Sequence, residues 1–123
     1  MPTLYAKTVG VTVLLIAVVG LLAGEGPLLG VFNIEIVEDL IHVVSGGLLA
    51  YAGFGTRDAG LTRTIVGGIG VVYLIVGVIG FILPMLMGLL PEYGYSLADN
   101  LLHLALGGLA LGAVAAPTPA RTR

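Results

Sequence analysis

The sequence Leu97-Ala98-Asp99-Asn100-Leu101-Leu102-His103-Leu104-Ala105-Leu106-Gly107-Gly108 has a near-copy in the first half of the chain, Val37-Glu38-Asp39-Leu40-Ile41-His42-Val43-Val44-Ser45-Gly46-Gly47. In both copies a carboxylate stands four residues before a histidine, and a glycine stands four residues after it. Apart from these polar groups the sequence is apolar and runs on without a break. The chain has only these two histidines. This recurrence indicates a duplicated helical unit, which organises the rest of the chain.

The composition places the whole chain in a lipid bilayer. It has 123 residues, of which 58% are hydrophobic and 10% charged, with a mean hydropathy of +1.12. These values lie far outside the range of soluble domains. The chain contains four apolar stretches, Thr8–Gly24, Ile36–Gly55, Thr64–Leu83 and Leu97–Ala116. Each is close to the roughly 20 residues that a helix needs to cross a bilayer. We therefore predict a single all-α domain over residues 1–123, an integral membrane four-helix bundle.

The charges predict the orientation of the bundle. Every basic residue falls in the N-terminal tail, in the connection between the second and third helices, or in the C-terminal tail: Lys7, Arg57, Arg63, Arg121 and Arg123. Six of the seven acids, all except Asp58, cluster toward the opposite side: Glu25, Glu35, Glu38, Asp39, Glu92 and Asp99. The positive-inside rule then puts both termini in the cytoplasm, in a multi-pass protein of the cell membrane. Residues 117–123 are predicted to form a flexible cytoplasmic tail, and Tyr93 and Tyr95 to lie at the outer interface.

Small residues repeat between the two halves. Gly10, Ala17 and Gly20 of the first helix recur as Gly70, Gly77 and Gly80 of the third, and Gly46 of the second recurs as Gly107 of the fourth. Repeat 1 covers about residues 8–55 and repeat 2 about residues 64–116. Because two crossings return the chain to its starting side, the repeats are parallel (non-inverted), about a pseudo-two-fold axis along the membrane normal. Small residues let helices approach closely in lipid, so we expect the first and third helices to pack along this seam.

Capping residues predict where the helices begin. Asn33 is a predicted N-cap of the second helix, and either Asp58 or Thr62 caps the third. Ser96 and Asp99 have the spacing of a capping box at the start of the fourth helix.

The two carboxylate-histidine pairs are the candidate site. Glu38 lies one helical turn from His42, and Asp99 one turn from His103, within hydrogen-bonding reach. If the second and fourth helices meet, these four side chains converge and could bind a divalent transition-metal ion. Two imidazoles could instead hold a haem iron, or the cluster could bind a quinone or lipid headgroup. In the structural alternative, Asp99 only caps its helix and the histidines make interhelical hydrogen bonds. The sequence favours no particular cofactor.

Other classes of function have less support. There is no cysteine, and Ser45, which follows His42, has no oxyanion donors because helix-interior amides are already bonded. We therefore predict no catalytic residues and no enzyme. The tail arginines are too few for a nucleic-acid patch. Few polar groups line the inner part of the helices, so a complete proton path is hard to draw. A pore formed by several copies of the chain is retained as an alternative.

The residues of the fourth helix resemble a known motif. Ala98 to Gly107 resembles the Ala-Asp-Asn-x-Leu-His-x-x-Leu-Gly signature of the domain of unknown function 4383 family, small four-helix membrane proteins of prokaryotes. Gly30–Ile34 and Gly70–Gly80 resemble its other blocks, and the likeness covers about residues 10–112. The family tends to have His-Asn where this chain has Glu38-Asp39, which changes the charge and the metal preference. The resemblance implies a four-helix integral membrane protein and no established activity.

The favoured hypothesis from the sequence is a structural or accessory membrane protein. Little chain remains outside the bilayer for soluble partners, so its partners are expected to be the lipid bilayer and either further copies of itself or another membrane protein. The alternative is a metal- or cofactor-binding bundle that uses Glu38, His42, Asp99 and His103.

Overall fold

The computed structural model describes residues 1–88 and 93–117. Its helices are α1 (Pro2–Ala23), α2 (Ile36–Ala50), α3 (Ala59–Ile82) and α4 (Leu97–Ala115), and a π-helical turn at Tyr51–Gly55 continues α2. A short antiparallel hairpin, β1 (Gly26–Leu28) and β2 (Phe32–Ile34), connects α1 to α2, and a 3-10 turn at Leu86–Gly88 follows α3. Of the predicted tail, residues 118–123 lie outside the described residues, as do Leu89–Glu92 in the connection before α4.

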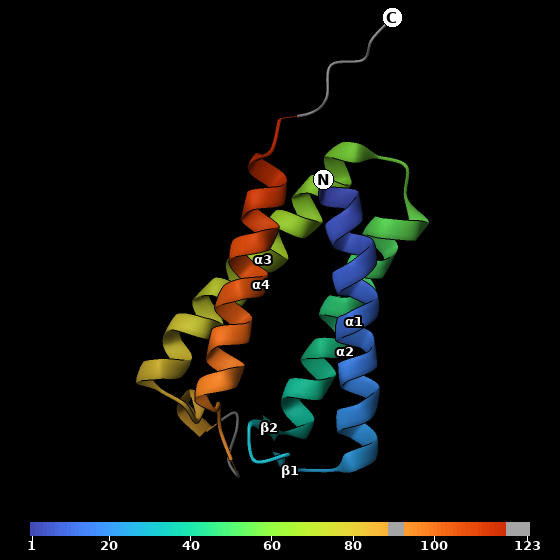
Figure 1. Ribbon diagram of the computed structural model, residues 1–123. Coiled ribbons are helices and arrows are strands. Elements are labelled where there is room, and N and C mark those ends of the chain that lie inside the picture. The colour runs from blue at the N-terminus through green and yellow to red at the C-terminus, as the bar shows by residue number, and fades with distance from the viewer. Residues whose placement is uncertain (89–92, 118–123) are drawn as a thin grey trace, which may run out of the picture.

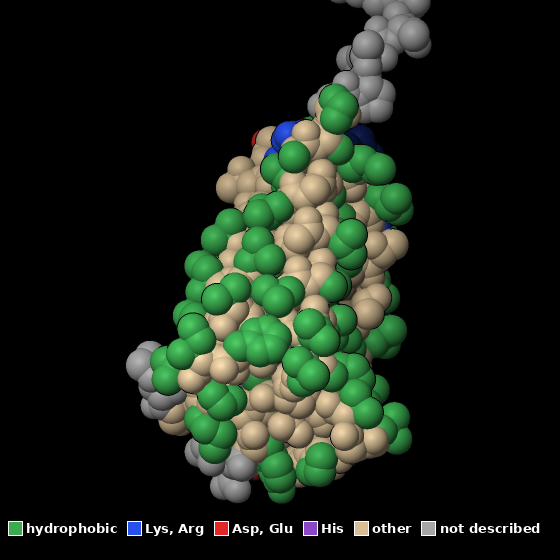
Figure 2. Space-filling model, turned by 60° about the vertical axis from the view of Figure 1, so that its left-hand side comes forward, with side chains coloured by type: hydrophobic (Ala, Val, Ile, Leu, Met, Phe, Trp, Pro, Cys, Tyr) green, Lys and Arg blue, Asp and Glu red, His purple; other side chains and the backbone are tan. Residues whose placement is uncertain are grey.

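The four helices are long and apolar enough to cross a membrane, by length and composition. This confirms the prediction of an all-α membrane bundle at the level of its helices. α1 and α3 both begin earlier than the predicted apolar stretches. α1 starts at Pro2, and proline is tolerated at this first helical position because a backbone N–H there would have no partner within the helix. Hydrophobic side chains cover the length of the face in Figure 2, and Lys and Arg gather at one end.

The helices form two antiparallel hairpins, α1 with α2 and α3 with α4 (Figure 1). The start of α1 and the end of α4 lie at the same end of the bundle, which we call the terminal end (Figure 1). β1 and β2 lie at the other, which we call the β-hairpin end. Near the terminal end, all four helices contribute to one buried cluster, formed by Tyr5, Ala6, Leu49, Ala52, Val66, Ile69, Tyr73 and Ala110. There the Tyr5 hydroxyl donates a hydrogen bond to the Leu106 carbonyl at 2.8 Å, joining α1 to α4.

The small residues pack within each hairpin, so the predicted seam between the first and third helices is wrong. A Cβ atom added at Gly10 would lie 2.7 Å from the backbone nitrogen of Ala50 in α2. One added at Gly70 would lie 2.6 Å from the Cβ atom of Ala110 in α4. Because short connections bring neighbouring helices together as antiparallel pairs, each stripe meets the next helix of its own hairpin.

Corresponding positions in the two hairpins make corresponding contacts. Gly46 lies against Leu14 as Gly107 lies against Leu74, and Gly20 lies against the Asp39 carboxylate as Gly80 lies against the Asn100 side chain. Gly77 is packed against Leu104. All eight small residues singled out from the sequence are buried: Gly10, Ala17, Gly20, Gly46, Gly70, Gly77, Gly80 and Gly107.

The caps agree with the sequence at two helices and differ at the third. Asp58 caps α3, accepting a hydrogen bond from the Leu61 amide at 3.0 Å, and Ser96 and Asp99 form the capping box of α4. The N-cap of α2 is Glu35, and not Asn33 as predicted. Asn33 belongs to β2, where pairing with β1 holds its backbone extended, and so it lies outside the helix.

Candidate metal centre

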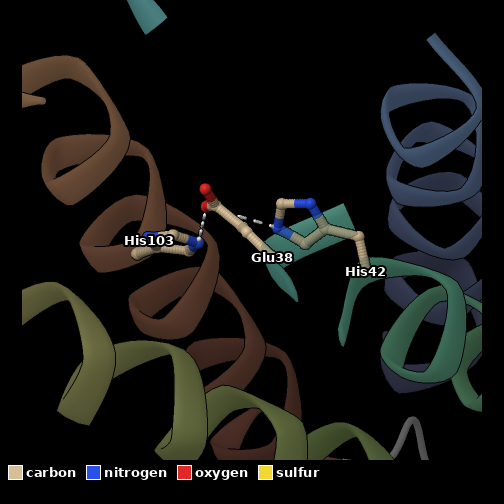
Figure 3. Close-up of side chains that lie close together, drawn as sticks. All are labelled: Glu38, His42 and His103. Carbon is tan, nitrogen blue, oxygen red and sulfur yellow. Dashed lines mark ion pairs between the residues drawn. The ribbon is translucent and has the colours of Figure 1, made fainter. Parts of the chain in front are cut away.

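Three of the predicted ligands converge near the β-hairpin end, where α2 faces α4. We call Glu38, His42 and His103 the triad. The Glu38 side chain reaches between the two imidazoles, and its Oε1 lies 3.6 Å from Nε2 of His103 and 3.9 Å from Nε2 of His42 (Figure 3). One ligand atom of each residue lies within 4.8 Å of the others. The ring centroids of the histidines are 6.0 Å apart, so both imidazoles lie close enough to bind the same ion.

The triad fits a transition-metal ion. Donors at about 2.0–2.2 Å from a tetrahedral ion lie about 3.4 Å from one another. The distances from Glu38 to the two imidazoles, 3.6 and 3.9 Å, are close to that value. The ring nitrogens that approach Glu38 are the Nε2 atoms of both histidines. Two imidazoles and a carboxylate form a donor set that suits ions such as Zn²⁺ better than Mg²⁺ or Ca²⁺.

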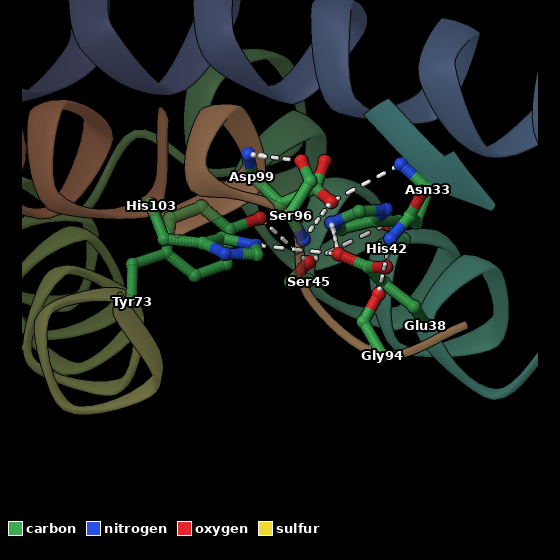
Figure 4. A network of polar contacts seen from close by, with 9 residues as sticks. All are labelled: Asn33, Glu38, His42, Ser45, Tyr73, Gly94, Ser96, Asp99 and His103. Atoms are coloured by element: carbon green, nitrogen blue, oxygen red, sulfur yellow. Dashed lines mark hydrogen bonds and ion pairs between the residues drawn. The ribbon is translucent and has the colours of Figure 1, made fainter. Parts of the chain in front are cut away.

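Aromatic rings enclose His103. The ring of Tyr95 meets the imidazole edge-on at 5.1 Å and the ring of Tyr73 lies at 5.5 Å, centroid to centroid. The Tyr73 hydroxyl shares a hydrogen bond of 3.0 Å with the Ser45 hydroxyl, which fixes that ring (Figure 4). Tyr95 was predicted at the interface, but it is buried, since its ring fills the space beside His103. Burial raises the pKa of the Tyr95 phenol, and nearby Glu38 and Asp99 add to the shift, so the ring stays neutral.

Asp99, the fourth predicted ligand, is occupied elsewhere. Its Oδ2 accepts hydrogen bonds from the Ser96 amide at 2.8 Å and from the Asn33 amide at 3.1 Å (Figure 4). The Ser96 hydroxyl in turn accepts from the Asp99 amide at 3.1 Å, which completes the capping box. Asp99 therefore caps α4, as in the structural alternative, and also ties α4 to β2.

Asp99 belongs to a hydrogen-bonded group that we call the latch, with Asn33, Glu35 and Ser96. Oε1 of Glu35 accepts from the amides of Tyr93 and Gly94 at 2.6 and 2.7 Å. The Asn33 side chain donates to the Gly94 carbonyl at 3.0 Å. The Ser96 hydroxyl donates to the Val31 carbonyl at 2.8 Å. The latch thus joins the segment before α2 to the segment before α4.

Sequence reasoning missed the roles of Asn33 and Glu35 in the latch. Both partners of Glu35 are backbone amides more than fifty residues away along the chain, Tyr93 and Gly94. Backbone donors leave no mark in a sequence, so this pairing had no local signal. The presence of a glutamate directly before an apolar helix was the one available hint, because acidic residues favour helix N-termini.

The β-hairpin end carries buried acids that, within the described residues, have no lysine or arginine as an ion-pair partner. Glu35, Glu38, Asp39 and Asp99 are 1%, 6%, 4% and 6% exposed. Within residues 1–88 and 93–117, the only ion pairs join Glu38 to the two histidines. The Asp39 Oδ2 atom has no hydrogen-bond partner in the same part of the chain. Burying uncompensated charge is costly, so this end is suited to a bound cation.

A cavity of about 340 Å³ opens beside the triad, which is near the lower limit for small-molecule sites. Apolar side chains of α1, the β-hairpin and α4 form its walls, among them Val13, Ile16, Phe32, Leu102 and Leu106. Its polar end is formed by Glu38, Asp39, His42, Asp99 and His103.

Comparison with known proteins found no match, whether to protein-family models, to curated proteins or to solved structures. The resemblance of Ala98 to Gly107 to the domain of unknown function 4383 family therefore stays a prediction from that motif.

Proposed function

We propose that this chain is a small integral membrane protein that binds a divalent transition-metal ion through Glu38, His42 and His103. The observation that carries the proposal is the approach of three ligand atoms to within 4.8 Å inside the bundle. These three side chains differ from the latch, because the distances from Glu38 to the imidazoles, 3.6 and 3.9 Å, are too long for hydrogen bonds. Polar groups that served only to fix helix register would be expected to hydrogen-bond to one another.

The balance of charge supports the same proposal. A divalent cation offsets the buried carboxylate of Glu38 and part of the charge of its acidic neighbours, in a region where burial makes such compensation valuable. Three protein ligands also leave one position of a tetrahedral ion open. The adjoining cavity gives that position room for a further ligand.

The test uses the full chain purified in detergent. We expect close to one equivalent of bound metal per chain by elemental mass spectrometry, or after titration with Zn²⁺ or Co²⁺. His42→Ala, His103→Ala and Glu38→Gln should lose it, whereas the control Ser96→Ala, which alters the latch alone, should keep it. Wild-type protein that binds no metal would overturn the proposal, and a Soret band lost in both histidine variants would replace the metal ion by haem.

The latch favours a second candidate, a structural or accessory membrane protein that associates with copies of itself or with another membrane protein. Its hydrogen bonds cross between the halves of the chain and stabilise one arrangement of the helices. In that case the triad variants would change thermal stability while no metal is present in wild-type protein.

The finer architecture also belongs to the proposal. The matching contacts of Gly46 with Leu14 and of Gly107 with Leu74 support two parallel copies of one helical hairpin. The basic residues Lys7, Arg57 and Arg63 support a cytoplasmic location for the terminal end. The triad then lies in the outer half of a cell membrane.

A further inference from the structure

We propose that the cavity between α1 and α4 binds a lipophilic organic cation, with its apolar body against the cavity walls and its positive charge near Asp39. This goes beyond the proposed metal site, because it depends on the cavity and on a carboxylate outside the triad. It concerns the protein without bound metal, in which no divalent ion offsets the charge of the acids that line the cavity.

The cavity opens sideways toward the hydrocarbon of the bilayer. Four of its lining residues have their side chains on the lipid-facing surface: Leu15, Ile16, Val19 and Leu102 are 61%, 38%, 50% and 38% exposed. They come from α1 and α4, the helices on either side of the opening. A molecule dissolved in the bilayer therefore reaches the cavity without passing through water.

The polar end of the cavity selects for positive charge. Glu38, Asp39 and Asp99 line it together with His42 and His103, and no lysine or arginine lines it within residues 1–88 and 93–117. An anion placed there would meet like charge in a medium of low dielectric constant, where repulsion is strong. A cation meets opposite charge.

Asp39 is the cavity-lining residue whose carboxylate would gain a partner from such a ligand. It is 4% exposed, lines the cavity beside Gly20, and its Oδ2 has no hydrogen-bond partner among the residues that the structure describes. A lipid acyl chain would cover the apolar walls but leave this carboxylate without a partner. An organic cation satisfies both requirements, since its body covers the walls and its charge pairs with the carboxylate.

The second half of the chain supplies a conservative variant for the test. At the position that corresponds to Asp39, Asn100 packs against Gly80 as Asp39 packs against Gly20. An asparagine is therefore accommodated in this packing environment, and Asp39→Asn should fold. It removes the charge and keeps the shape of the side chain.

The experiment compares two probes of the same shape and opposite charge. Full-length protein in phosphatidylcholine nanodiscs, with a chelator present, is dialysed against tetraphenylphosphonium or tetraphenylborate. We expect saturable binding of the phosphonium above that of empty nanodiscs, and none of the borate. Asp39→Asn should weaken phosphonium binding about tenfold or more, as expected for loss of a buried charge partner.

Adjacent leucines supply the matched control for the cavity itself. Leu102 lines the cavity, whereas Leu101 faces lipid and does not line it. Leu102→Trp should fill the cavity and abolish phosphonium binding, and Leu101→Trp should leave it unchanged. Equal effects of the two tryptophans, unchanged binding in Asp39→Asn, or equal binding of both probes would overturn the proposal. Metal content reports on the triad separately, because Asp39→Asn leaves Glu38, His42 and His103 intact.

Discussion

Replacing Gly107 by alanine tests the packing of α3 against α4 at a point where the two backbones approach closely. A Cβ atom there would lie 2.7 Å from Cγ of Leu74 and 2.8 Å from both the Leu74 nitrogen and the Gly70 carbonyl oxygen. Two of these three atoms are backbone, so the helices must separate to make room. Overpacking of this kind costs about 1–3 kcal/mol. Gly108, the next residue of α4, would place its Cβ atom in open space, with nothing within 4 Å.

Comparing Gly107→Ala with Gly108→Ala cancels the contribution of helix propensity to the difference in stability. Alanine gains about 0.5–1 kcal/mol over glycine inside a helix, and both variants receive this gain. We therefore expect Gly107→Ala to be about 1–3 kcal/mol less stable than Gly108→Ala. The measurement is reversible unfolding in mixed micelles with increasing dodecyl sulfate, followed by circular dichroism.

The other hairpin provides an independent comparison. A Cβ atom at Gly46 would lie 3.0 Å from Leu14, a looser fit than at Gly107, and one at Gly47 would meet nothing within 4 Å. The gap in stability between Gly46→Ala and Gly47→Ala should thus have the same sign and a smaller size. If Gly107→Ala is as stable as Gly108→Ala, close packing of the helices at this point is refuted.

Two further predictions concern the latch and the orientation. Asp99→Ala should lower the free energy of unfolding by about 2–5 kcal/mol, because the amides of Asn33 and Ser96 lose a charged acceptor, and it should leave metal binding intact. Unchanged stability in the same dodecyl sulfate titration would contradict the role of the latch. The chain has no cysteine, so Leu29→Cys and Thr56→Cys each introduce a single thiol. A membrane-impermeant maleimide added to intact cells should label Leu29→Cys alone. Labelling of Thr56→Cys alone would reverse the predicted orientation.

The helices and several of their ends were predictable because their signals are local. Runs of apolar residues of bilayer length predicted the four helices, and Asp58 and Ser96 have the side chains that helix N-termini require. The start of α2 was not predictable in this way. Glu35 occupies the N-cap position because β1 pairs with β2 up to Ile34.

The candidate site was predictable in part. The spacing of Glu38 and His42 on one helix brings them together, and His103 joins them because α4 faces α2. Asp99 has the same spacing from His103, yet its carboxylate turns to the amides of Ser96 and Asn33. A carboxylate near the first turn of a helix can bond either to the turn or to a neighbour, and the sequence leaves that choice open.

The sequence by itself determined the number of helices, the side on which the basic residues gather and the positions of the small residues on each helix, since these follow from composition and from the helical period. Only the tertiary structure decided which helix each stripe of small residues meets. It also decided that Tyr95 turns inward, that among the described residues the buried acids gather at one end, where Glu38 pairs with histidines alone, and that a cavity opens beside them. The physical reason is that lipid solvates every apolar face of a helix about equally well, so hydrophobicity does not select the neighbour. Close packing at Gly10, Gly70 and Gly107 and the hydrogen bonds of the latch make that selection, and both depend on residues distant in the sequence.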